Sequence, residues 1–145
     1  MKLGLRGWSG VVAVLLIWAA AYLFWLYAFP SPIELMGGDT VTPQKVRAGE
    51  RVSITRNFRV LRAEPLNVTR EAIRGDCKKS CEVIDLTSST MTLPPGEYRN
   101  VVREHTIPIH AEPGIWRLVF SVHWQGRFGR YVSESLPELT IEVIQ

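Results

Sequence analysis

The sequence is poor in the residues that build metal and redox centres. It has two cysteines and three histidines among 145 residues, and no histidine lies near Cys77 or Cys81. A structural zinc site needs four ligands, and redox proteins use a tighter Cys-x-x-Cys spacing. There is also no phosphate-binding glycine loop and no nucleophile on a strand-to-helix turn. We therefore expect no enzyme activity, no cofactor and no metal site.

Negative charge is absent from the start of the chain. No acidic residue precedes Glu34, and residues 8–29 form a run of 22 residues without any charge. As a helix this run would rise about 33 Å, enough for a hydrocarbon core of ~30 Å. Lys2 and Arg6 precede it, and positive charge favours the cytoplasmic side. The sequence therefore predicts a cytoplasmic N-terminus over residues 1–7 and a transmembrane helix over residues 8–29.

This topology sets the predicted location. We expect a signal anchor in the cytoplasmic (inner) membrane, a single pass, a lipid bilayer as partner, and a periplasmic C-terminal domain. A cleaved secretory signal is the alternative, because Ala19, Ala20 and Ala21 offer small residues after a short apolar stretch. No cysteine follows the apolar run closely, which argues against an acyl anchor.

A concentrated basic surface is also missing. Two of the 17 basic residues lie in the N-terminal seven, so residues 30–145 carry 15 basic and 14 acidic residues. Their arginines are scattered with acids between them, whereas nucleic-acid binding needs a concentrated basic face. We expect no nucleic acid among the partners.

From Asp39 onward the hydrophobic period is two. In residues 115–125, Trp116, Leu118, Phe120, Val122 and Trp124 alternate with more polar residues, the pattern of a strand with one buried face. Arg56 interrupts a similar strand over 51–61, which indicates a bulge or an arginine stem over apolar neighbours. Seven or eight such strands predict an antiparallel two-sheet sandwich over 39–145, after a linker over 30–38.

The last third of the chain carries a resemblance. A Pro113-Gly114 turn precedes the strand with Trp116, Leu118 and Phe120, and a final alternating strand follows Pro137. This arrangement resembles immunoglobulin-like or fibronectin-III-like domains of small membrane-anchored bacterial or phage envelope proteins. The resemblance implies an all-β fold: an antiparallel two-sheet immunoglobulin-like sandwich preceded by one N-terminal transmembrane helix.

The two cysteines are expected to pair. An even cysteine count in an exported domain suggests a disulfide, here between Cys77 and Cys81. Free thiols or intermolecular pairing are the alternatives.

One turn combines residue types that are enriched at binding hot spots. Trp124, Arg127, Phe128, Arg130 and Tyr131 gather around the turn at 126–129. Loops at the end of a sandwich commonly bind partners, although a well-packed hairpin with solvated arginines would look the same. We predict a single-pass membrane protein that presents its sandwich to an envelope protein, in an envelope assembly or a phage-encoded envelope function.

A second hypothesis uses the histidines. His105 and His110 flank Pro108, and His123 lies on the polar face of its strand. Copper or zinc would need a ligand cluster with recognisable spacing, which these positions do not form. The alternative function is an exported carrier domain for a small ligand or for copper or zinc, and an envelope enzyme is the third hypothesis, although no catalytic motif supports it.

Overall fold

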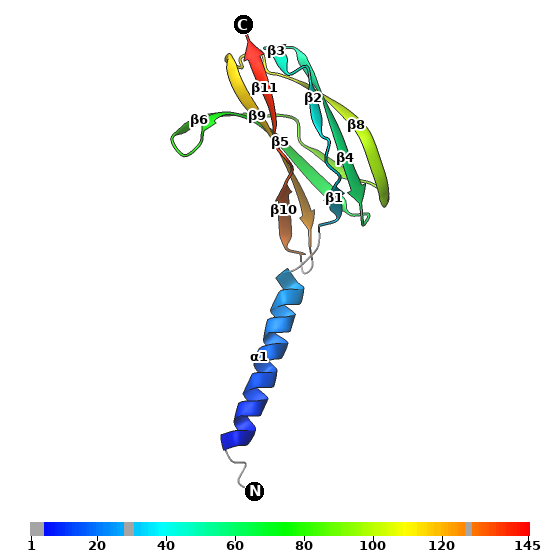
Figure 1. Ribbon diagram of the computed structural model, residues 1–145, viewed down its shortest axis with the longest axis vertical. Helices are drawn as coiled ribbons and strands as arrows, with labels where there is room; N and C mark the ends of the chain where they lie inside the picture. Colours follow the sequence, from blue (N-terminus) through cyan, green and yellow to red (C-terminus); the bar gives the residue numbers. More distant parts are fainter. Residues whose placement is uncertain (1–4, 28–30, 127–128) are drawn as a thin grey trace.

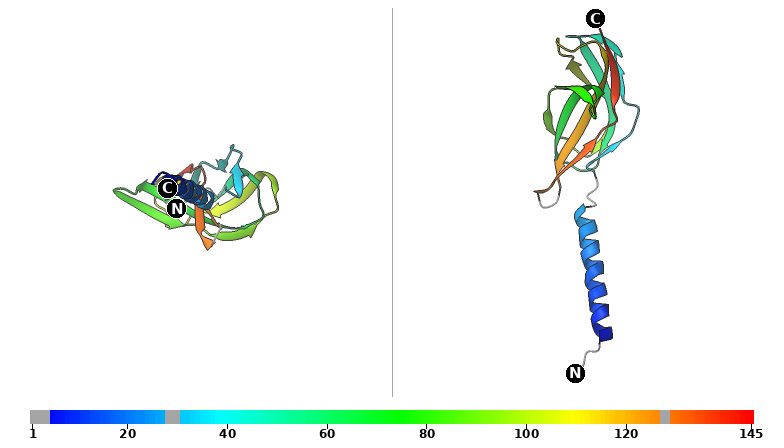
Figure 2. Two further views of the ribbon diagram at one scale, coloured as in Figure 1. Left: turned by 90° about the horizontal axis from the view of Figure 1, so that it is seen from below. Right: turned by 90° about the vertical axis from the view of Figure 1, so that its left-hand side faces the viewer.

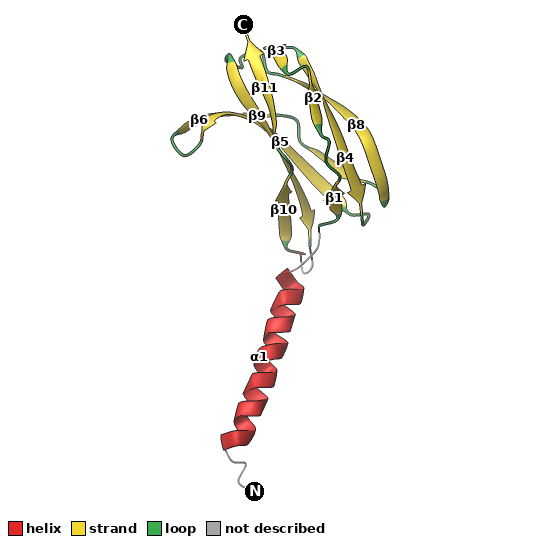
Figure 3. Cartoon of the chain, viewed as in Figure 1, coloured by secondary structure: helices red, strands yellow, loops and turns green. Residues whose placement is uncertain are grey.

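The computed structural model describes residues 5–27, 31–126 and 129–145, with the side chains of the N-terminal helix described from Gly10 to Trp25. Helix α1 (Leu5–Tyr27) precedes the strands (Figures 1 and 3). The strands are β1 (Ile33–Leu35), β2 (Thr40–Thr42), β3 (Lys45–Arg47), β4 (Arg51–Val60), β5 (Pro65–Asp76), β6 (Ser80–Asp85), β7 (Ser89–Thr92), β8 (Gly96–Thr106), β9 (Gly114–Gln125), β10 (Tyr131–Ser135) and β11 (Leu139–Ile144).

The strands form two sheets that face each other (Figures 1 and 2). In the first sheet, β4 pairs with β8 along one edge and with β1 and β2 along the other. In the second sheet the order is β3-β11-β9-β5-β6, with β10 also paired to β9 and β7 to β5. β8 of the first sheet and β6 and β7 of the second are therefore edge strands.

The core lies between the sheets, as the alternation in β9 predicts. Trp116, Leu118, Phe120, Val122 and Trp124 are at most 4% exposed, and the residues between them are more accessible. They pack in two clusters, one around Trp116 and Leu118 and the other around Val122 and Trp124. The period-two interpretation of this strand is confirmed.

Arg56 shows both features that its position indicates. The pairing of β4 with β8 shifts register between Arg56 and Phe58, so the strand carries a bulge or similar irregularity there. The Arg56 guanidinium carbon lies 4.7 Å from the centre of the Phe120 ring, and the side chain is only 11% exposed. The Arg56 side chain therefore lies inside the fold, with its guanidinium over the apolar ring of Phe120.

The predicted fold class needs correction in the sheets. β3 pairs with β11 in parallel, so the second sheet is mixed and not antiparallel throughout. Residues 40–47 are divided between the sheets: β2 joins the first sheet, whereas β3 joins the second. Pro43 lies between them and has no N–H to donate, so it cannot continue a ladder. β1 lies within the stretch 30–38 that the sequence assigned to a linker.

The predicted membrane span needs correction as well. Within the described part of the chain, no helix is both long and apolar enough to cross a membrane. This finding overturns the transmembrane helix over 8–29, the signal anchor, and the single-pass inner-membrane location with a periplasmic domain.

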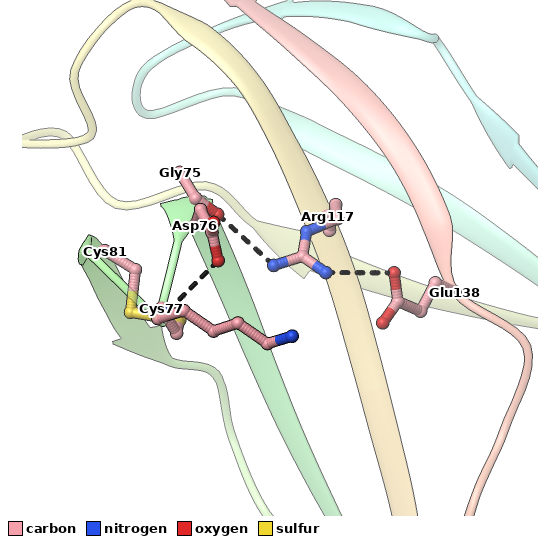
Figure 4. Close-up of a disulfide and its surroundings, with 7 residues drawn as sticks. Gly75, Asp76, Cys77, Cys81, Arg117 and Glu138 are labelled. Carbon is pink, nitrogen blue, oxygen red and sulfur yellow. Dashed lines mark hydrogen bonds and ion pairs between the residues drawn. A yellow bond between two sulfur atoms is a disulfide. The ribbon is translucent and has the colours of Figure 1, made fainter.

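A disulfide closes the hairpin between β5 and β6. Cys77 and Cys81 are bonded, with their Cα atoms 4.6 Å apart, as predicted (Figure 4). Gly75 precedes the loop at a φ of +90°, and a Cβ atom there would lie 2.9 Å from the carbonyl oxygen of Ser80. Arg117 on β9 supports the hairpin, because its guanidinium donates to the carbonyl oxygen of Gly75 at 3.3 Å and to Glu138 at 3.4 Å.

Candidate functional site

An apolar cavity of about 280 Å³ lies between the two sheets. The first sheet lines it with side chains from β1, β4 and β8, and the second with side chains from β5, β7 and β9. Ile54, Phe58 and Val101 face it from the first sheet, and Val68, Phe120 and Val122 from the second. Pockets that bind small molecules are mostly apolar in this way and carry few polar groups.

Three valines among the larger lining residues contribute to this space. Val68, Val101 and Val122 lie on three different strands, and a valine reaches less far across the space between two sheets than a tryptophan or leucine. At the other end of the sandwich, Trp116 and Leu118 are at most 1% exposed and fill that space. The second core cluster therefore leaves space for another molecule.

A polar cleft of about 530 Å³ adjoins the cavity. Four residues line both spaces: Arg70, Met91, Arg103 and His105. The rest of the cleft is lined mainly by polar residues of segments 85–90 and 104–106, together with Leu86 and Pro108, so it is more polar than the cavity. The two spaces together have an apolar interior and a polar entrance, with basic groups at the boundary.

Arg70 brings a cation into the interior from β5. It pairs with Phe120 of β9 in register and is 8% exposed. Its guanidinium donates to the carbonyl oxygen of Thr87 at 2.6 Å and to the Ser89 hydroxyl at 2.8 Å, which are both neutral acceptors. Burial, and then the charge of Arg103, lower the pKa of Arg70. Among the described residues, no carboxylate forms an ion pair with it.

Arg103 and His105 face Arg70 from β8, at the edge of the first sheet. Their register partners on β4 are Ile54 and Val52, which are buried, so both positions belong to the inward face. Arg103 is exposed, and no ion pair to it is found in the part of the chain that the structure describes. His105 is half-buried and meets the Phe120 ring edge-on at 5.9 Å between centroids.

The electrostatics of the cluster keep His105 neutral near pH 7. Burial lowers the pKa of His105 below its ordinary 6.5, and the positive charges of Arg70 and Arg103 lower it further. A neutral imidazole can still donate or accept one hydrogen bond. The boundary thus offers two permanent cations and one polar ring.

A second arginine at the cavity is already paired. Arg56 donates to the Asp39 carboxylate at 2.5 Å and to the carbonyl oxygen of Pro137 at 3.2 Å. The other carboxylate oxygen of Asp39 accepts the backbone N–H of Asn57 at 3.0 Å. The Nη2 atom of Arg56 is buried without a hydrogen-bond partner among the described residues.

Comparisons with known proteins identify no family. No family model matches the chain, and no curated protein is similar to it in sequence. Its fold is similar to part of the Pseudomonas fluorescens alkylpurine DNA glycosylase AlkC, solved bound to DNA containing an abasic site analog. That match has a TM-score of 0.47 and 17% identity, and covers 86% of this chain and 34% of AlkC. For Spo0M, the sporulation control protein from Bacillus subtilis, the TM-score is 0.39 with 11% identity, covering 79% of this chain and 50% of that one.

These likenesses carry no argument about function, because both TM-scores are below 0.5. This chain spans about a third of AlkC and half of Spo0M. The predicted partners are corrected here. The lipid bilayer was predicted as a partner only because of the transmembrane helix, and no described helix can span a membrane. The envelope protein was inferred from the same membrane location, so that partner loses its basis as well. AlkC was solved with DNA, but a likeness at this TM-score says nothing about whether this chain binds nucleic acid.

The structure does not gather the predicted hairpin residues into one surface. Trp124 is 3% exposed and belongs to the second core cluster, so it is not available to a partner. Tyr131 is 78% exposed and Arg130 is also exposed. Arg127 and Phe128 lie outside the described residues. Trp124 points inward because it continues the parity of Val122 and Phe120 on β9.

The three histidines are not brought together. His123 forms a hydrogen bond of 3.0 Å with the Thr69 hydroxyl, His110 is exposed, and His105 lies at the cavity. Among residues 5–27, 31–126 and 129–145, no group of three or more potential metal ligands is found.

The residues at the cavity boundary carry a sequence signal that the search for motifs misses. Arg70 continues the inward parity of Leu66 and Val68, and Arg103 and His105 share the parity of Val101. Charged residues on the buried parity of a strand are rare unless they have a partner. That rule, applied to β5, would have selected Arg70.

Proposed function

We propose that this chain is a binding domain for a small molecule, held in the cavity between the two sheets. This is the small-ligand part of the alternative function, without the export of the domain and without the binding of copper or zinc. The observation that carries it is an apolar cavity of about 280 Å³ that opens onto a polar cleft. An apolar cavity of about half that size, 150 Å³, stays dry and takes up benzene in an engineered protein.

A protein-binding role has weaker support from the described residues. Trp124, which was predicted to belong to a binding surface at the β9–β10 turn, is buried in the core. Arg127 and Phe128, at the centre of that turn, lie outside the described residues. Protein–protein interaction at that turn stays a prediction, as does the absence of enzyme activity.

The test is a titration of the full chain with 1-octanol, which is apolar and uncharged. The chain has three methionines, and Met91 lies at both the cavity and the cleft. We would label the methionine methyl groups with carbon-13 and assign the Met91 signal with Met91→Leu. A saturable shift of this signal is expected, and a Met91 signal that does not respond would contradict the proposal.

Two neighbouring valines on β8 give a matched pair of variants. Val101 lines the cavity, whereas Val102 is 54% exposed on the opposite face of the strand. Val101→Phe should occupy the cavity and abolish the saturable shift, and Val102→Phe should leave it unchanged. Equal effects of the two substitutions would show that octanol binds elsewhere.

A further inference from the structure

The boundary between the cavity and the cleft has an excess of positive charge. Arg70 from β5 and Arg103 from β8 approach it from opposite sheets, with His105 beside them. Among the ion pairs of the described residues, none includes Arg70 or Arg103. Two carboxylates, Asp85 and Glu104, line only the polar cleft, and Glu104 already pairs with Arg51 at 3.3 Å.

Arg70 is the unusual member of this group. Its side chain is buried, yet the hydrogen bonds to Thr87 and Ser89 bring it no negative charge. Buried charges in proteins are normally paired or bound to a ligand of opposite charge. Arg103 lies close enough to lower the pKa of Arg70, so the two cations repel each other without an anion between them.

We propose that the cavity takes a small molecule with an apolar body and a single anionic head group, a carboxylate, sulfonate or phosphate, and that Arg70 and Arg103 bind this head. The inference rests on the proposed function, because the apolar body is what the cavity holds. Hydrogen bonds from guanidinium to such oxygens are charge-assisted and stronger than neutral ones. A head held from both sheets would offset part of the excess charge at the boundary and reduce the repulsion between the two arginines.

Octane-1-sulfonate is the probe for the test, because its charge does not change with pH. Octanol supplies the same chain without a charge, and octyltrimethylammonium supplies it with a positive one. Each is titrated into the full chain while the Met91 methyl signal is followed. The sulfonate should bind about tenfold or more tightly than octanol, as expected for one charge-assisted hydrogen bond, and the ammonium more weakly than octanol.

Two arginines of β8 provide the decisive comparison. Arg103 lines the site, whereas Arg99 is exposed and pairs with Glu97. Arg103→Gln should reduce sulfonate affinity about tenfold and leave octanol unaffected, and Arg99→Gln, with the same change of charge, should alter neither. Arg70→Met should act in the same direction as Arg103→Gln, although it also removes the bonds to Thr87 and Ser89.

The outcomes separate this inference from the proposed function. If octanol and the sulfonate bind equally and Arg103→Gln changes neither affinity, the anion site is wrong while the apolar cavity site stands. If the ammonium binds as tightly as the sulfonate, the anion site is likewise wrong. If none of the probes shifts the Met91 signal, both proposals are refuted.

Discussion

The ion pair between Arg56 and Asp39 offers the sharpest test of the packing between the sheets. Their side chains are 11% and 6% exposed, so water screens the pair very little. Asp39→Asn keeps the shape of the side chain but removes its charge. The amide oxygen can still accept the N–H of Asn57, whereas the amide NH₂ cannot accept from Arg56. The substitution therefore leaves an arginine cation buried without a counter-ion.

The expected loss is large for a single substitution. Removing one partner of a buried ion pair destabilises a protein by about 3–5 kcal/mol, out of a typical total of about 5–15 kcal/mol. The exposed pair Arg51–Glu104, whose side chains are 73% and 61% exposed, is the matched control. Glu104→Gln makes the same carboxylate-to-amide change and should destabilise by less than about 1 kcal/mol.

Urea denaturation followed by tryptophan fluorescence measures both losses. A lower midpoint at an unchanged slope would report a change in stability alone. The double variant Asp39→Asn with Arg56→Met removes the unpaired cation and should recover most of the loss. The reasoning would be refuted if Asp39→Asn lowered the free energy of unfolding no more than Glu104→Gln does. It would also be refuted if the double variant were no more stable than Asp39→Asn alone. Either result would mean that the loss does not come from an unpaired buried cation.

Three further outcomes are expected. Because the fold lowers the pKa of His105, the unfolded chain binds a proton at this residue more readily than the folded chain does. The contribution of His105 to stability should therefore be complete above about pH 6.5 and decrease at lower pH. Urea midpoints measured between about pH 5 and pH 8 should show this decrease, and His105→Gln should remove it. Leu118→Ala should lower the free energy of unfolding by about 2–5 kcal/mol, and Arg117→Ala, on the opposite face of β9, by less than about 1 kcal/mol. Equal shifts of the urea midpoint would mean that the inward and outward faces of β9 are assigned wrongly. Replacing Cys77 and Cys81 by serine should cost about 2 kcal/mol in thermal unfolding, and alkylation of the unreduced chain would refute the disulfide.

Alternation along the chain predicts the strands of this fold better than their partners. β9 is recognisable because five apolar side chains share one parity over its length. The division of residues 40–47 between two sheets cannot be recognised from the sequence, because each of the two strands is three residues long and its partner strand is distant in sequence. β3 pairs with β11 almost a hundred residues later, and nothing local distinguishes a parallel from an antiparallel partner.

The candidate site shows a different limit. A search for motifs favours the β9–β10 turn, where aromatic and arginine residues are neighbours in the sequence. The boundary residues Arg70 and Arg103 come from strands in different sheets and become neighbours only when the sheets pack. Parity in β5 does place Arg70 on a buried face, whereas no residue of β8 is buried to mark such a face for Arg103. A charge at such a position needs a group of opposite charge beside it, and its absence from the sequence pattern is the signal for a ligand.

The cavity itself argues for a binding role, because it is expensive in stability. At roughly 24 cal/mol per Å³, a closed and empty cavity of 280 Å³ would cost about 7 kcal/mol, comparable with the whole stability of a small domain. The opening to the polar cleft admits water and makes the true cost smaller. Filling the space with Val101→Phe should therefore stabilise the fold while it abolishes binding. A mere packing defect would gain the same stability with no binding to lose, so the two measurements together distinguish a binding site from a flaw.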